Sequence, residues 1–387
     1  MQYTIHTMTR IAGDARLLTF TDNNGIVTDA FINTTLSNRN FTSFAKNKNP
    51  HFVLEGVKRI CGVCHAVQGT VCCKAFEDAM GISVPEGGVL LRELCTELNR
   101  LQSHSLAQIM LTDDIFASNV IPEIKENLFK LYKSINTAME CAGGAMINLP
   151  HLVIGGMSKE LTKTKLAKLN TLISYIEELL IQYIENFKHS TFMSEEYIEL
   201  KSIEKSKRFL AIGLFSYDKS KIDLNFIEIL PNIPTNEQSI KGIKKNKDVV
   251  ATYKGNSVEV GPRARLSLFK DFKGKGLTGI NEARVREMIL SIEQIKKILK
   301  KIYPNDKVMA DDAILKKGES TIVFEAPRGT LIHSIKIGNN LKVSEYNIIF
   351  PTMFNILIIQ EILKGMPVRL SKIIIRLYDP CIPCEVH

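Results

Sequence analysis

Two Cys-x-x-Cys pairs near opposite ends of the chain constrain the fold more than any other feature. The first pair lies in "RICGVCHAVQG", residues 59–69, and the second lies in "DPCIPCEVH", the last nine of 387 residues. Cysteines spaced by three can direct both sulfurs toward one point, and a second such pair completes a site of four thiolates. If the two pairs form one site, the fold must bring its two ends together.

A structural zinc site is one alternative for these cysteines. Such a site normally clips a local loop, and its ligand pairs lie close together in the sequence. Here more than 300 residues separate the pairs. The spacing therefore favours one functional site inside a large core, and a zinc clamp in a non-catalytic subunit stays open as an alternative.

Composition and charge set the protein class. With 45% apolar residues and no repeat or linker-like segment, residues 1–387 are predicted to form a single domain. The N-terminus lacks the pattern of an export signal, and the apolar run "FNILIIQEIL" is broken by Gln360 and Glu361, so we expect a cytoplasmic protein with no membrane span. Reduced cysteines are then more consistent with metal ligands than with disulfides. The net charge of +9 comes from dispersed lysines, which argues against a nucleic-acid partner.

The spacing of apolar residues predicts a mainly α protein with small β elements (α+β). Alternating runs at residues 15–21 and 26–32, joined by "DNNG", predict an N-terminal β hairpin. Residues 320–337 also resemble β structure, and Ser158 is a candidate N-cap for one of the helices. Steps of three and four residues between apolar side chains predict helices over 88–111, 127–146, 158–190 and 281–303, with a final helix ahead of the terminal cysteines.

The sequence around both cysteine pairs resembles the large, catalytic subunit of [NiFe]-hydrogenases. "RICGVC" and the terminal "DPCxxCxxH" pattern carry this resemblance, and it extends through "TRIAGDARL", "EVGPRARL", "EAPRGTLIH" and "NIIFPTMFN". The chain is most similar to the cytoplasmic, methanogen-type branch, which includes coenzyme F420-reducing and heterodisulfide-reductase-linked enzymes. The resemblance implies a helical core in which both ends of the chain meet at a metal site.

The resemblance also implies the metal ligands. Cys61, Cys64, Cys381 and Cys384 would bind nickel, and Cys64 and Cys384 would bridge to an iron that carries cyanide and carbonyl ligands. Soft thiolates suit both metals. The implied reaction is heterolytic oxidation or formation of dihydrogen.

Further residues are implied next to the metals. Arg328, in the Pro-Arg-Gly turn, would hold its guanidinium over the site, and Asp379 would place a charge beside Cys381. Cys384 would accept the proton. His387 is a candidate ligand for a magnesium or iron ion, and His104 lies in a segment that resembles a site-lining helix of the family.

Three positions depart from the family pattern. Ala12 stands where a glutamate resembles a proton gate, Thr42 stands where a carboxylate would assist His387, and Gln68 stands where a histidine follows the first cysteine pair. A neutral hydroxyl is a weak ligand for a hard divalent cation, so metal binding at His387 is left open. These departures motivate a second interpretation, in which the chain is a hydrogenase paralogue with altered or lost activity toward dihydrogen.

The electrons require a partner. The remaining cysteines fall on apolar or helical stretches and are expected to pack in the core; they are Cys72, Cys73, Cys95 and Cys141. The chain thus lacks an array of cysteines for iron–sulfur clusters, and an iron–sulfur small subunit is expected to receive the electrons. A further electron-transfer subunit linked to coenzyme F420 or to heterodisulfide reductase is a second expected partner.

Overall fold

The structure, a computed structural model, describes most of the chain. The described residues are 2–7, 16–33, 41–203, 208–218, 222–233, 249–274 and 276–380. Four residues singled out above, Ala12, Cys381, Cys384 and His387, lie outside these ranges.

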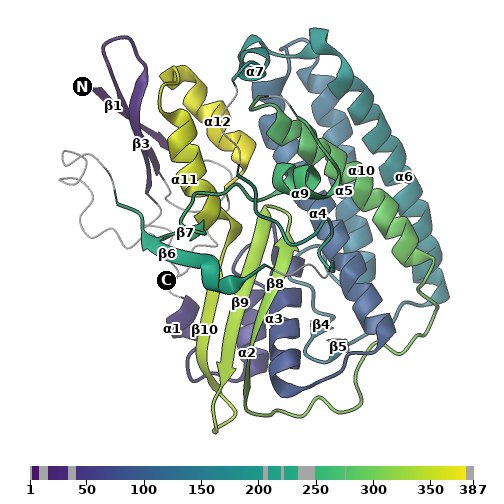
Figure 1. Ribbon diagram of the computed structural model, residues 1–387. Coiled ribbons are helices and arrows are strands. Elements are labelled where there is room, and N and C mark those ends of the chain that lie inside the picture. Colours follow the sequence, from purple (N-terminus) through teal and green to yellow (C-terminus); the bar gives the residue numbers. More distant parts are fainter. Residues whose placement is uncertain are drawn as a thin grey trace.

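Long helices form one side of the molecule (Figure 1). Helix α4 packs against both α5 and α10, and α6 packs against α5 and α10. Their bounds are α4 (Glu86–Ile115), α5 (Ile121–Gly143), α6 (Lys163–Lys188) and α10 (Gly279–Leu299). All four helices predicted from apolar spacing are confirmed. The predicted N-cap is wrong, because α6 begins at Lys163 and the hydroxyl of Thr162 accepts from the backbone N–H of Lys165.

An antiparallel sheet lies beside these helices, with strand order β10-β9-β8. Its strands are β8 (Gly318–Ala326), β9 (Gly329–Ile337) and β10 (Val343–Ile349). Helix α3 (His65–Met80) packs against β8 and β9 and also contacts α4. The helix that follows the first cysteine pair is therefore held between the sheet and the helical body.

A second sheet contains the predicted hairpin, whose two strands are confirmed. It consists of β1 (Gln2–Thr7), β2 (Arg16–Thr21) and β3 (Val27–Asn33). Gly25 has φ +74° in the turn between β2 and β3, a value that glycine adopts without steric cost. The backbone N–H of Ile32 donates to Gln360 Oε1 at 3.0 Å in α11 (Pro351–Leu363). The N-terminal sheet therefore packs against a helix from the last tenth of the chain.

Shorter elements complete the described part. They are α1 (Phe41–Ala45), α2 (Pro50–Val57), β4 (Leu152–Val153), β5 (Gly156–Met157), η2 (Ser190–Phe192), α7 (Glu195–Leu200), η3 (Leu224–Phe226), β6 (Ile227–Pro231), β7 (Val249–Tyr253), α9 (Pro262–Phe269), η4 (Val368–Leu370) and α12 (Ser371–Tyr378). The fold is mainly α with small sheets, as predicted. Among the described helices, none is long and apolar enough to cross a membrane. The single domain over residues 1–387 stays a prediction.

Candidate metal centre

The first cysteine pair lies at the N-terminal end of α3. Cys64 is the N-cap residue of this helix, and Cys61 precedes it by three residues. Both side chains are buried. The backbone N–H of Val63 donates to Cys61 Sγ at 3.4 Å. The thiolate is the form of cysteine that binds metals, and its sulfur can accept hydrogen bonds from N–H groups of this kind.

Neutral side chains hold the loop that carries this pair. Asn99 Nδ2 donates to the carbonyl oxygen of Val63 at 2.9 Å and to Gln102 Oε1 at 2.9 Å. His65 Nε2 lies 3.1 Å from the same Gln102 oxygen. Burial lowers the pKa of His65 to about 4, so its ring is neutral at pH 7. An amide oxygen only accepts, and His65 Nε2 is therefore the donor.

Gln68 directly contacts one of the predicted ligands. Its Nε2 donates to Cys64 Sγ at 3.9 Å, and its Oε1 lies 3.0 Å from His333 Nε2. Sequence analysis identified Gln68 only as a departure from the family pattern. The contact shows that this glutamine still presents an N–H group to the sulfur.

Arg328 and Asp379 lie in contact. Arg328 lies in the two-residue turn between β8 and β9, and its Nε donates to Asp379 Oδ2 at 3.2 Å. Both side chains are buried. Asp379 ends α12 in the left-handed region with φ +51°, and the chain continues through Pro380 toward Cys381.

Two glycines allow the Pro-Arg-Gly turn to pack against a mid-chain loop. Gly261 and Gly329 have φ values of +115° and +133°. A Cβ on Gly261 would lie 2.9 Å from the Arg328 carbonyl oxygen, and a Cβ on Gly329 would lie 2.5 Å from a side-chain carbon of Val260. The backbone of "EVGPRARL" can therefore lie directly on the turn that presents Arg328.

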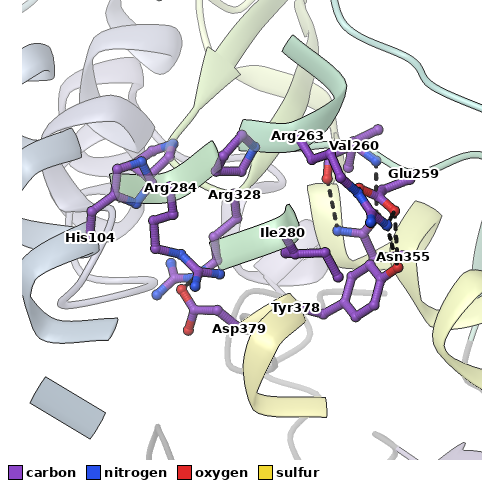
Figure 2. A pocket seen from close by; sticks show the side chains of 12 residues that line it. His104, Glu259, Val260, Arg263, Ile280, Arg284, Arg328, Asn355, Tyr378 and Asp379 are labelled. Carbon is purple, nitrogen blue, oxygen red and sulfur yellow. Dashed lines mark hydrogen bonds and ion pairs between the residues drawn. The ribbon is translucent and has the colours of Figure 1, made fainter. Parts of the chain in front are cut away.

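A small cavity lies beside Arg328 and Asp379 (Figure 2). Its volume is about 10 Å³, which suits about one water molecule. Polar residues from separate elements line it; among them are His104, Arg263, Arg284, Arg328 and Asp379. The helix that carries His104 therefore borders the same cavity as the Arg328 turn.

A buried network of ion pairs reaches this cavity through His104. Arg265 binds Glu287 through both Nε, at 2.5 Å, and Nη2, at 2.8 Å, and its Nη1 donates to Glu325 Oε2 at 2.8 Å. Glu287 also lies 2.9 Å from His104 Nε2. Burial raises the pKa of Glu287, but its contacts with Arg265 and His104 lower this pKa by a larger amount. The pKa of Glu287 therefore lies below its usual value. Burial lowers the pKa of His104 to about 3, so this ring is neutral and donates through Nε2.

Arg284 is a residue that the sequence analysis missed. Its guanidinium donates to Asn281 Oδ1 at 2.7 Å and to the carbonyl oxygen of Leu377 at 2.5 Å. In the described part of the chain it forms no ion pair with a carboxylate. Burial, together with the nearby charge of Arg328, lowers its pKa to about 10. Figure 2 shows the guanidinium groups of Arg284 and Arg328 beside the Asp379 carboxylate. No sequence motif marks this arginine, which lies in an ordinary amphipathic helix.

One stretch of α4 connects the two parts of the site. Asn99 and Gln102 hold the cysteine loop, and His104 lines the cavity next to Arg328. Asn99 and His104 are only about 8 Å apart along the helix axis. Cys61 and Cys64 therefore lie against the same helix segment as the pocket that contains Asp379.

The sulfurs of Cys61 and Cys64 fit a soft metal centre. The described residues contain no group of three or more His, Cys, Asp or Glu that could hold a metal ion. They do contain two buried sulfurs with N–H donors, and Asp379 is only two residues before Cys381. Cys381, Cys384 and His387 lie outside the described residues, and their roles stay predictions.

The other predicted residues have clear places. Four cysteines are buried in the core; they are Cys72, Cys73, Cys95 and Cys141. Burial raises the pKa of Cys73 and of Cys95 to about 12, which makes both thiols unreactive. Thr42 lies in α1 and is half-buried.

Comparisons with known proteins find relatives along nearly the whole chain. A model of the nickel-dependent hydrogenase family matches residues 39–111 and 275–387. The chain is 30% identical to the alpha subunit of the coenzyme F420 hydrogenase of Methanocaldococcus jannaschii, over 98% of this chain and 92% of that protein. It is 24% identical to the corresponding subunit of the F420-non-reducing hydrogenase vhc of Methanococcus voltae, over 99% and 94% of the two chains.

The fold is also found among solved structures. The Ni-Fe-Se hydrogenase from D. vulgaris Hildenborough superposes with a TM-score of 0.83 over 100% of both chains, at 22% identity. The resemblance drawn from the cysteine motifs is thus confirmed across the whole length. The chain belongs to the nickel-dependent hydrogenase large-subunit family.

Proposed function

We propose that this chain is the catalytic large subunit of a [NiFe]-hydrogenase that oxidises and forms dihydrogen heterolytically. The observation that carries the proposal is the 3.2 Å contact between Arg328 Nε and Asp379 Oδ2. It joins the Pro-Arg-Gly turn to the segment that leads into Cys381 and Cys384. Methanogen relatives that are named hydrogenases support the same activity.

Four cysteines bind the metals in this proposal. Cys61, Cys64, Cys381 and Cys384 would hold nickel, and Cys64 and Cys384 would also hold an iron that carries cyanide and carbonyl ligands. The two described sulfurs are buried and are contacted by N–H donors, which suits soft metals in a dry site. When bound, such a centre supplies an open coordination position that polarises dihydrogen and takes up its electrons.

The chain's own residues supply charge and a proton acceptor. Arg328 places a fixed positive charge at the site, and Asp379 orients the guanidinium through its carboxylate. Arg284 adds a second guanidinium beside Arg328. In this proposal the Cys384 thiolate receives the proton as dihydrogen is split.

Electrons leave through a separate iron–sulfur small subunit. Apart from the two pairs, the chain has four cysteines, and all of them are buried in the core. We place the complex in the cytoplasm and assign a coenzyme F420-linked or heterodisulfide-reductase-linked protein as the next electron carrier. The name of one methanogen relative, coenzyme F420 hydrogenase, supports the first option, and the name of another, F420-non-reducing hydrogenase, shows that similar chains also serve enzymes that do not reduce this coenzyme. His387 stays a candidate ligand for a magnesium or iron ion, for which Thr42 offers only a neutral hydroxyl.

The test uses the protein purified from its host together with its small subunit. We expect nickel and iron in the large subunit, carbonyl and cyanide bands in the infrared spectrum, and hydrogen-dependent reduction of a dye. Zinc without these bands would contradict the proposal and favour a structural clamp. The bands without dye reduction would favour the paralogue suggested by Ala12 and Thr42.

A matched pair of variants tests the ligand assignment. Cys64→Ser replaces a soft sulfur by a hard oxygen, so we expect loss of nickel and of the carbonyl band. Cys95→Ser makes the same change at a buried cysteine in α4 and should keep both. Full nickel content in Cys64→Ser would show that the ligand set is wrong.

A further inference from the structure

Gln68 shares one face of α3 with two cysteines. It follows Cys64 by four residues and precedes Cys72 by four, and residues at this spacing lie one above the other along a helix. All three side chains are buried. The 3.9 Å contact between Gln68 Nε2 and Cys64 Sγ is thus made where water cannot replace either group.

The hydrogen bonds of His333 fix the direction of the Gln68 amide. His333 Nε2 lies 3.0 Å from Gln68 Oε1, and His333 Nδ1 lies 2.8 Å from the hydroxyl of Tyr346. Burial lowers the pKa of His333 to about 3, so the ring carries one proton at neutral pH. Because an amide oxygen only accepts, that proton is on Nε2. Nδ1 then accepts from the Tyr346 hydroxyl.

Three donors then point the same way, from Tyr346 through His333 and Gln68 to the sulfur of Cys64. Near Tyr346, burial raises the pKa of the Cys72 thiol well above its usual range, so this sulfur stays protonated at neutral pH.

Reversing the amide would be costly. It would turn the partial negative charge of Oε1 toward a thiolate, and it would place an N–H group against the N–H of His333. Relief would require the other tautomer of His333 and a reversed hydroxyl on Tyr346. Since all of these groups are buried, no water can compensate for a mismatch. The sheet thus selects one orientation of a side chain on α3.

We propose that Gln68 is a positioning residue for the metal-binding thiolate of Cys64, locked by His333 and Tyr346 so that its N–H withdraws electron density from the sulfur. The inference rests on the proposed function, because it concerns what this sulfur donates to a bound metal. Glutamine supplies the N–H without carrying a positive charge. The departure at position 68 therefore leaves Cys64 with an N–H donor from this position of α3.

The experiment compares infrared spectra of the holoenzyme with its small subunit. Gln68→Met keeps the side-chain length and removes the N–H donor, so Cys64 donates more electron density and the carbonyl band moves to lower wavenumber. The affinity for nickel should fall by about 10- to 100-fold, as for other hydrogen-bond partners of metal ligands. Tyr346→Phe releases the lock from its far end and should give a smaller shift in the same direction with nickel retained.

Two further variants separate this role from general packing. Gln68→His restores an N–H donor and should return the band toward its wild-type position. Gln108→Met removes another buried glutamine that binds a tyrosine, Tyr183, at 2.6 Å, and it should leave the band unchanged. An unshifted band in both Gln68→Met and Tyr346→Phe would overturn the inference. Absence of the band from the wild-type protein would instead overturn the proposed function.

Discussion

The two sides of the site are built from different chemistry. Near Cys61 and Cys64 the hydrogen bonds described above are made by neutral side chains, namely amides, histidines and a tyrosine. On the side of the cavity three arginines form ion pairs with four carboxylates; they are Arg263, Arg265 and Arg328, with Glu259, Glu287, Glu325 and Asp379. Arg284 lines the same cavity and forms no ion pair among the described residues. The neutral side can adjust a thiolate without adding a charge. The charged side fixes the position of the Arg328 guanidinium, because a buried charge is costly unless an opposite charge is paired with it.

The largest expected effect tests whether the charged side depends on complete ion pairs. Arg265→Met leaves Glu287 and Glu325 buried without their shared cation, and we expect a loss of about 3–5 kcal/mol in the free energy of unfolding. Urea unfolding measures this loss. Lys296→Met is the control, because its ion pair with Glu177 is 42% and 36% exposed and should contribute less than about 1 kcal/mol. Similar losses in both variants would show that burial is not what matters here.

The second prediction concerns pH and the neutral side. The pKa of His333 is about 3 in the folded protein against 6.5 ordinarily, so the unfolded chain takes up a proton first as the pH falls. The neutral ring of His333 therefore contributes its full stability above about pH 6.5, and this contribution is lost as the pH falls toward about 3. By pH 5 about 2 kcal/mol of it has been lost. The deficit of His333→Gln relative to wild type should therefore shrink by about 2 kcal/mol between pH 7 and pH 5. A deficit equal at both pH values, measured by urea unfolding, would contradict a neutral His333.

The smallest effect compares one tyrosine from each side. The Tyr378 hydroxyl donates to Glu259 Oε2 at 2.9 Å and accepts from Arg263, whereas the Tyr346 hydroxyl bonds the neutral ring of His333. Hydrogen bonds to charged groups contribute about 1.5–3 kcal/mol, and neutral ones contribute about 0.5–1.5 kcal/mol. Tyr378→Phe should thus be less stable than Tyr346→Phe by about 1 kcal/mol. Equal unfolding free energies for the two variants would remove the distinction between the sides.

Much of the fold could be predicted because it depends on local patterns. Apolar periodicity gave the four long helices, and "DNNG" gave the turn between β2 and β3. The N-cap of α6 was misplaced because Ser158 and Thr162 are both suitable cap residues, and only the tertiary structure decides where the helix begins.

The residues of the site also differ in whether local sequence or tertiary contacts determine their roles. Arg328 and Asp379 could be found because each lies in a motif that resembles the family. Arg284 and Glu287 could not, since their roles arise from contacts between elements distant in the sequence. His333 ends the motif "EAPRGTLIH", but its role likewise comes from a distant contact, with Gln68 in α3. The sequence identifies Gln68 only as a position where the family's histidine is absent. Its contact with Cys64 Sγ could not be predicted, because the orientation of the amide depends on His333 in β9.

The contact between the loops of Gly261 and Gly329 restricts which substitutions the protein can accept. Neither glycine has a side chain that could take part in chemistry, yet a methyl group on either one would push the Arg328 turn away from the mid-chain loop. In a library of all single substitutions, both positions should tolerate as few replacements as the four cysteines proposed to bind metal. Activity would be lost there through displacement of a guanidinium, in proteins that still fold around the same helices.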